Sequence, residues 1–201
     1  MLFTDGVFPA DGTSVPHGTR GGIIQVAYTA VNGVSSCNAS GGSLTNMSAF
    51  DTTLTPRDSS NTILIQVYLG AISANGGNSM LCEVRRNNSS IDAMRGNADS
   101  SRPRGTMRGV FRWNADSNHA HSYMLQVEDQ PASTAQVTYK VFFAGESNPN
   151  TIWVNRQHSS GGDGNYYGSR VMSSMTVMEI SKASFMITKQ YMRLINQLLL
   201  R

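Results

Sequence analysis

At 201 residues the chain is long enough to bury the core of one domain, and only 14% of its residues are charged, against about 25% in an average soluble domain. Its net charge of +3 comes from scattered arginines, and their mild concentration between Arg95 and Arg112 lacks the density and the interleaved aromatic residues of a nucleic-acid patch, so we expect no nucleic-acid partner. We find no secretory signal or membrane-spanning stretch, and two cysteines, Cys37 and Cys82, make neither a disulfide framework nor a metal motif.

Residues 1–20 have the composition of an extended leader or linker, because turn-forming Asp-Gly pairs and prolines recur in them. A single sandwich domain is expected over residues 21–180. Its first strand is predicted over residues 23–31, followed by a stretch rich in Gly, Ser and Asn over residues 32–46 that we interpret as an exposed loop. Residues 47–54 are predicted to form a short strand.

The clearest strand pattern lies in residues 63–72. Large hydrophobic residues occupy every second position: Ile63, Ile65, Val67 and Leu69. This alternation predicts a central strand with one fully buried face. The turn chemistry of residues 75–78, Asn-Gly-Gly-Asn, predicts that residues 79–86 return as the antiparallel hairpin partner of this strand, with Cys82 facing the core.

Further strands are predicted after a long polar surface connection over residues 87–104. They cover residues 107–113, 121–128, 135–144, 151–156 and 174–180, and the second and third of them are expected to form a hairpin. About nine short strands separated by turns predict an all-β fold, an antiparallel Greek-key or jelly-roll-like β-sandwich. Large side chains exceed what one sandwich interior needs, which favours a homotrimer: Phe111, Trp113, Phe142 and Trp153.

The hydrophobic period changes in residues 181–201. Ile187, Tyr191, Leu194 and Leu198 follow spacings of four, three and four, which predicts a C-terminal amphipathic helix of about 17 residues. Such a helix can pack on its own domain, associate with its copies in a short bundle, or lie on a membrane surface or a partner protein.

Enzyme motifs are scarce in this sequence. The sequence has no motif of a catalytic nucleophile, a phosphate-binding loop or a zinc protease. The two catalytic carboxylates of a glycosidase would have to be Asp163 together with Glu179 or Asp129. His119 and His121 fall on one side of a strand and could share a metal, but two ligands are too few for a site. We therefore expect no catalytic residue, no bound metal and no cofactor.

The loop of residues 159–170 is the best candidate for binding a receptor. Tyr166 and Tyr167 offer aromatic faces on which a sugar ring can stack, and Asp163, Asn165 and Arg170 can donate or accept hydrogen bonds. The alternative is a connection whose tyrosines only cover the edge of the sandwich.

Six segments carry a resemblance to a known family. They are Gly22-Ile-Ile-Gln-Val, Ser60-Asn-Thr-Ile-Leu-Ile-Gln-Val-Tyr-Leu-Gly, Val137-Thr-Tyr-Lys-Val-Phe-Phe, Thr151-Ile-Trp-Val-Asn-Arg156, Tyr167-Gly-Ser-Arg170 and Ser174-Met-Thr-Val-Met-Glu-Ile180. Over roughly residues 20–180 the chain resembles the C-terminal head domains of tail-fibre and other virion surface proteins of marine bacteriophages, which also occur in some large algal viruses. The resemblance implies a non-enzymatic virion component, a homotrimer that displays loops toward a host surface. The chemistry of the 159–170 loop favours a host cell-surface glycan as what these loops contact.

The chain departs from that family at both ends. It continues beyond Met178-Glu-Ile180 into the predicted helix, and no fibre shaft precedes Gly22. We therefore expect a protein made in the host cytoplasm that docks on the virion surface, on tail or capsid, through the helix or the leader. The alternative function is a free-standing carbohydrate-binding β-sandwich module or a polysaccharide-degrading enzyme domain.

Replacing Tyr166 and Tyr167 together by alanine tests the receptor loop. If the tyrosines stack on sugar rings, the double variant should bind host cells more weakly while its melting temperature stays nearly unchanged, because exposed substitutions usually alter stability by no more than about 0.5 kcal/mol. Cell-binding assays and thermal unfolding measure the two effects. Undiminished binding, or a large loss of stability, would show that the tyrosines only cover the sandwich.

Overall fold

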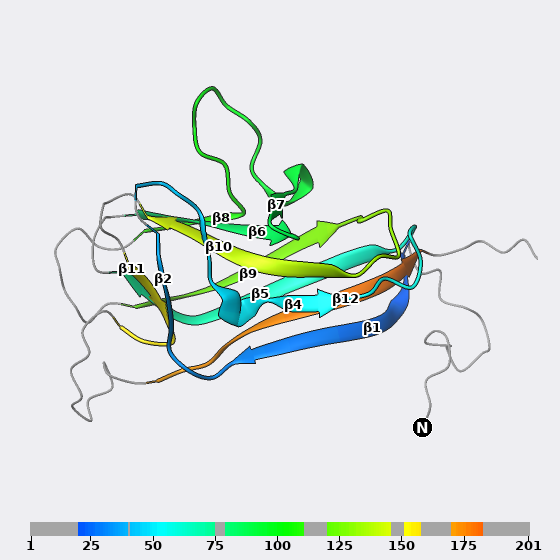
Figure 1. Ribbon diagram of the computed structural model, residues 1–201, viewed down its shortest axis with the longest axis horizontal. Helices are drawn as coiled ribbons and strands as arrows, with labels where there is room; N and C mark the ends of the chain where they lie inside the picture. The colour runs from blue at the N-terminus through cyan, green and yellow to red at the C-terminus, as the bar shows by residue number, and fades with distance from the viewer. Residues whose placement is uncertain are drawn as a thin grey trace, which may run out of the picture.

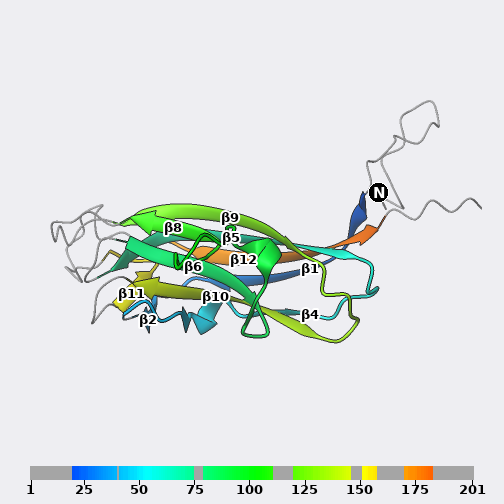
Figure 2. The same cartoon turned by 90° about the horizontal axis from the view of Figure 1, so that it is seen from above.

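In the computed structural model, residues 20–39, 41–74, 79–110, 120–145, 151–157 and 170–182 are described. Within these ranges the chain is all-β, and its strands form two antiparallel sheets that face each other (Figures 1 and 2). Two 3-10 helices, η1 (Ser48–Phe50) and η2 (Asp92–Met94), interrupt the connections. The predicted leader up to residue 19 and the predicted helix over residues 183–201 lie outside the described residues.

Each sheet contains six strands. Sheet I is formed by β1 (Arg20–Val31), β2 (Ser35–Asn38), β5 (Thr62–Ala74), β9 (His121–Asp129), β11 (Thr151–Val154) and β12 (Ser173–Lys182). Sheet II is formed by β3 (Thr45–Asn46), β4 (Thr52–Leu54), β6 (Ser79–Arg86), β7 (Ser89–Ser90), β8 (Met107–Val110) and β10 (Val137–Gly145). The first and last described strands, β1 and β12, are therefore neighbours in sheet I, as the blue and orange arrows of Figure 1 show.

The prediction of a central strand at residues 63–72 is confirmed. β5 pairs with β12 and β11 on one edge and with β9 on the other, and its inward residues Ile63, Ile65, Val67 and Leu69 are completely buried. They pack against the inner face of sheet II, where Tyr139, Val141, Phe143 and Cys82 are equally buried. Burying such side chains contributes roughly 1.5–3 kcal/mol each, so the facing layers stabilise one another.

Both predicted hairpins are wrong. β6 is not the partner of β5, because it lies in sheet II between β10 and β8. β9 and β10 likewise lie in different sheets. In each pair the second strand crosses to the opposite layer, where its hydrophobic face covers the core that the first strand leaves open. Turn chemistry shows that the chain reverses, but it does not decide in which layer the chain continues.

The expectation of an exposed loop over residues 32–46 is also wrong. This stretch supplies β2 and β3, and it buries Cys37 and Ala39 in the core. β2 has no alternating hydrophobic pattern that predicts a strand. Its pairing with β11 fixes its position in sheet I. Residues 47–54 contribute η1 as well as β4, with Met47 and Phe50 filling the core.

Two of the four supposedly surplus aromatic residues are covered by their own chain. Phe142 is only 7% exposed, with the guanidinium of Arg85 4.5 Å from the ring centroid, and Arg156 lies 5.1 Å from the ring centroid of Trp153. Cation–π contacts of this kind satisfy an aromatic face without a partner chain. Phe111 and Trp113 lie outside the described residues, so this reason for a trimer does not stand on the described part of the chain.

A buried asparagine joins four segments where sheet I changes neighbours. The side-chain amide of Asn155 donates to the carbonyl oxygens of Val31 (2.5 Å) and Gly33 (2.8 Å), and its carbonyl oxygen accepts from the Ser173 hydroxyl (2.6 Å). The Gly70 amide donates to the same hydroxyl at 2.9 Å. Asn155 has a φ of +67°, a conformation that asparagine adopts more readily than most residues.

Glycine at position 70 is required by a close approach of the chain. A Cβ atom added there would lie 2.1 Å from the carbonyl oxygen of Met172, a distance that backbone atoms cannot accept. The missing side chain lets the segment before β12 cross β5 at this point, where the pairing of β5 with β9 also shifts register.

Replacing Asn155 by alanine should destabilise the protein by on the order of 3 to 5 kcal/mol, because buried carbonyl and hydroxyl groups lose their partners. Urea unfolding measures this loss. Asn88→Ala is the control, since Asn88 also has a positive φ (72°) but lies exposed in a turn, and it should cost about 1 kcal/mol. Equal losses for both variants would show that backbone conformation, and not the hydrogen bonds of Asn155, accounts for the effect.

Candidate functional site

The predicted receptor-binding residues fall mainly outside the described part of the chain. Asp163, Asn165, Tyr166 and Tyr167 are not among the described residues, and Arg170 is exposed just before β12. The receptor loop therefore stays a prediction. Of the described residues that flank this loop, Gln157 follows β11 and Arg170 precedes β12.

The structure places one of the two histidines considered for a metal. His121 begins β9 and is half-buried, whereas His119 is not described. The described residues contain no cluster of three or more His, Cys, Asp or Glu side chains that could hold a metal ion. Among them, too, no helix has the length and hydrophobicity needed to cross a membrane.

Asp129, one carboxylate weighed for a glycosidase, is held in the interior between the sheets. Arg86 donates from Nη1 to both carboxylate oxygens, at 3.1 and 2.9 Å, and the Tyr139 hydroxyl donates at 2.8 Å. Burial, together with the neighbouring Asp129 charge, raises the pKa of Tyr139 far above its ordinary value. This carboxylate is fully occupied in joining β9 to β10 and β6, which is a structural role.

Glu179, the other carboxylate weighed, is buried at the end of sheet I where β12 meets the 55–61 turn. It accepts hydrogen bonds from the side chains of Asn61 (2.7 Å) and Gln25 and from the amide of Arg57 (2.8 Å). Loss of hydration would by itself raise the pKa of Glu179, but these hydrogen bonds stabilise the charged form and hold the pKa below its ordinary value of 4.5. A carboxylate held ionised in this way is a poor general acid.

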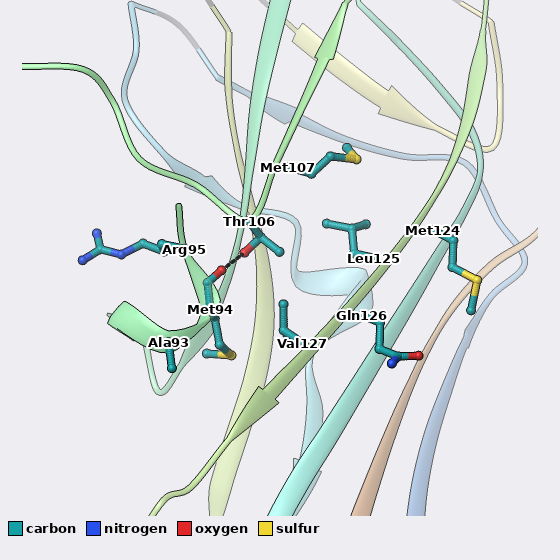
Figure 3. Close-up of a pocket in the computed structure, with 9 residues that line it drawn as sticks. All are labelled: Ala93, Met94, Arg95, Thr106, Met107, Met124, Leu125, Gln126 and Val127. Atoms are coloured by element: carbon teal, nitrogen blue, oxygen red, sulfur yellow. Dashed lines mark hydrogen bonds between the residues drawn. The ribbon is translucent and has the colours of Figure 1, made fainter. Parts of the chain in front are cut away.

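A pocket of about 410 Å³ opens between the two sheets at the edge formed by β9 (Figure 3). On one side lies the segment around η2, which is anchored by buried Met94 and by a hydrogen bond of 2.8 Å from the Thr106 hydroxyl to the Met94 carbonyl. On the other side lie residues of β9. The described lining is Ala93, Met94, Arg95, Thr106, Met107, Met124, Leu125, Gln126 and Val127. Among these described residues Arg95 is the one charged side chain, and they include no acid–base pair for catalysis.

The arginines near this pocket are engaged within the chain. Arg95 and Arg104 both contact Asp92, at 2.5 and 3.0 Å, and Arg102 contacts Asp99 at 3.2 Å. The neighbouring arginines hold the pKa of Asp92 below its usual range. The mild concentration of arginine seen in the sequence thus stabilises the connection between β6 and β8.

The most unusual surface of the described chain is the outer face of sheet I. Its positions come from four adjacent strands whose pairing aligns them: Ile23, Val26, Tyr28 and Ala30 on β1; Ser174, Thr176, Met178 and Ile180 on β12; Thr62, Leu64, Gln66 and Tyr68 on β5; and Ser122, Met124, Gln126 and Glu128 on β9. A bulge between Ile23 and Gln25 brings Ile23 opposite Ile180. Ile23, Val26, Tyr28, Tyr68 and Met124 are 45–66% exposed. Among these positions, all of them described, Glu128 at the margin is the one charged residue.

The cross-strand rows show how this face is built. One row joins Val26 to Met178 and Leu64, and another joins Ser174 to Tyr68 and Met124. Between them, Gln66 donates to Gln126 at 2.9 Å. Sequence reasoning missed this surface, although the outward positions of β5 and β1 carry large hydrophobic residues where a solvent-exposed sheet face would carry charges.

Comparison of the chain with models of known protein families and with curated protein sequences found no match. The fold and these surfaces therefore supply the argument for function.

Glu179→Gln should change how stability depends on pH. Because the folded protein holds the pKa of Glu179 below 4.5, ionised Glu179 stabilises the fold above that pH, and this contribution is lost as the pH falls through the folded-state pKa. Urea unfolding between pH 7 and pH 3 should show the parent far more stable than the variant at neutral pH and the difference shrinking in acid. A constant difference for Glu179→Gln would contradict the proposed network.

Proposed function

We propose that this chain is a non-enzymatic structural protein of a bacteriophage virion, which acts as a homotrimer at the virion surface in host attachment or in decoration of the tail or capsid. The observation that carries the proposal is the outer face of sheet I, a broad and nearly uncharged surface with exposed hydrophobic side chains, on a sandwich whose buried carboxylates have structural partners. Exposed hydrophobic surface of this kind favours an interface with another protein chain.

The connectivity of the strands favours the finer fold class, a Greek-key or jelly-roll-like sandwich. The chain passes from sheet I to sheet II between β2 and β3, between β5 and β6 and between β9 and β10, and its last described strand lies beside its first. Crossings of this kind between two antiparallel sheets are typical of jelly rolls. Viral capsid proteins are among those that use this architecture.

The described residues that border the undescribed segments support a protein with two functional ends. Arg20 and Lys182 pair, so the segments before β1 and after β12 begin side by side at one end of sheet I. Arg170, the described residue that follows the candidate receptor loop in sequence, leads into the start of β12, at the opposite end of that strand. An attachment protein needs this separation, because one end contacts the particle while the other is presented to a cell-surface glycan.

Particle incorporation tests the virion proposal. In a phage that encodes this chain, antibodies against it should label purified particles, and removal of residues 183–201 should abolish labelling while the truncated protein still unfolds cooperatively. Removal of residues 1–19 is the matched variant that tests the leader. Unlabelled parent particles would contradict the virion role, and full labelling after both truncations would contradict docking through the ends.

A further inference from the structure

We infer that the outer face of sheet I is the surface through which copies of this chain associate. The inference rests on the proposed homotrimer and assigns its interface to named strands. The face is contributed by β1, β12, β5 and β9, and it does not include the aromatic residues Phe142 and Trp153, which the chain covers with its own arginines.

The chemistry of the face suits a copy of itself. Two identical surfaces repel each other when they carry net charge, and this face carries a single charged residue at its margin. Besides Glu128, its polar groups are amides and hydroxyls, each of which can both donate and accept. They belong to Gln66, Gln126, Tyr28, Tyr68, Thr62, Ser122, Ser174 and Thr176. Groups of this kind can be satisfied by the same groups on another copy. A charged partner, such as nucleic acid or an acidic protein, would find no counter-charge here.

The size of the face favours more than two copies. Four strands and about seven residues along each span about 20 Å by about 20 Å, or about 400 Å². That is within the range of the largest apolar patches on ordinary monomers, which are often functional. Two such faces packed together would bury about 800 Å² of surface from solvent, which is below the roughly 1,200 Å² that stable interfaces bury. Three copies around an axis, each with its face against two neighbours, bury about 1,200 Å² of these faces in total, which is the lower end of that range.

The ends of the strands agree with this arrangement. Since β1 begins where β12 ends, at Arg20 and Lys182, a threefold axis along these strands brings the corresponding ends of all copies to one end of the assembly. The residues that follow Lys182 carry the amphipathic pattern Ile187, Tyr191, Leu194 and Leu198, for which a bundle of copies is one predicted partner. One axis can therefore serve both the sheet and the C-terminal segment.

A matched pair of valine variants of the full-length chain tests the inference. Val26 and Val34 are both exposed, at 56% and 44%, but Val26 lies on the outer face of sheet I and Val34 lies in the turn before β2. Light scattering at micromolar concentration should give the parent and Val34→Glu the mass of three chains of 21.8 kDa each. Val26→Glu should give the mass of one chain, a threefold loss, because the new carboxylate would be buried between copies. Met124→Glu, at the other side of the face, should do the same.

Far-UV circular dichroism and thermal melting show whether the variants fold, and if Val26→Glu does not fold, Met124→Glu decides. Folded variants of both positions that keep the parent's mass would overturn the assignment of the face while leaving the homotrimer intact. A parent with the mass of one chain would overturn association altogether. That result is expected where the segment after Lys182 covers this face within its own chain. Labelling of particles is measured separately, so a monomer that still labels virions would leave the virion role standing.

Discussion

Sheet I depends on the hydrogen bonds made by Asn155. At this residue the long strand β5 exchanges one neighbour, β12, for another, β11, and the backbone would otherwise leave buried carbonyl groups unpaired. The Asn155 amide takes up the carbonyls of Val31 and Gly33, while its oxygen and the Ser173 hydroxyl connect it to Gly70. A buried polar group without a partner costs about 1–3 kcal/mol, so the exchange of strands is possible only with this set of partners. The edge strand β2 is positioned through β11, and therefore through the same residue.

Each buried carboxylate connects a different pair of segments. Glu179 fixes the turn before β5 to β12, Asp129 joins β9 to β10 through Tyr139, and Glu83 contacts Arg85 at 3.1 Å beside Phe142. In a chain with few charges, these networks and the ion pairs of Asp92 place much of the described charge inside the sandwich or on the connection between β6 and β8. The outer face of sheet I carries one charged residue, Glu128, among the positions named above, which differs from an ordinary solvated sheet face and supports the proposed association.

The same geometry relates assembly to display. The long strands β1, β12 and β5 of sheet I lie side by side along the domain (Figure 2). In the proposed threefold association, with its axis along these strands, every copy points in the same direction. The pairing of Arg20 with Lys182 then defines one end of the proposed assembly, and the start of β12 defines the other. In the proposed virion role, the long strands would hold the docking end and the presented end apart.

The sequence by itself determined the all-β class, the position of the central strand and the inward direction of Cys82, because strand periodicity is a local property that alternating Ile63, Ile65, Val67 and Leu69 make visible. Only the tertiary structure decided that β6 and β10 lie in the second sheet, that residues 35–38 form a strand beside β11, and that Asn155 is indispensable to the junction. The surface of Val26, Tyr28, Tyr68 and Met124 belongs to the same category. Its strands are separated by up to about 150 residues along the chain, and their side chains form one face only after antiparallel pairing has set the register, which no local pattern encodes.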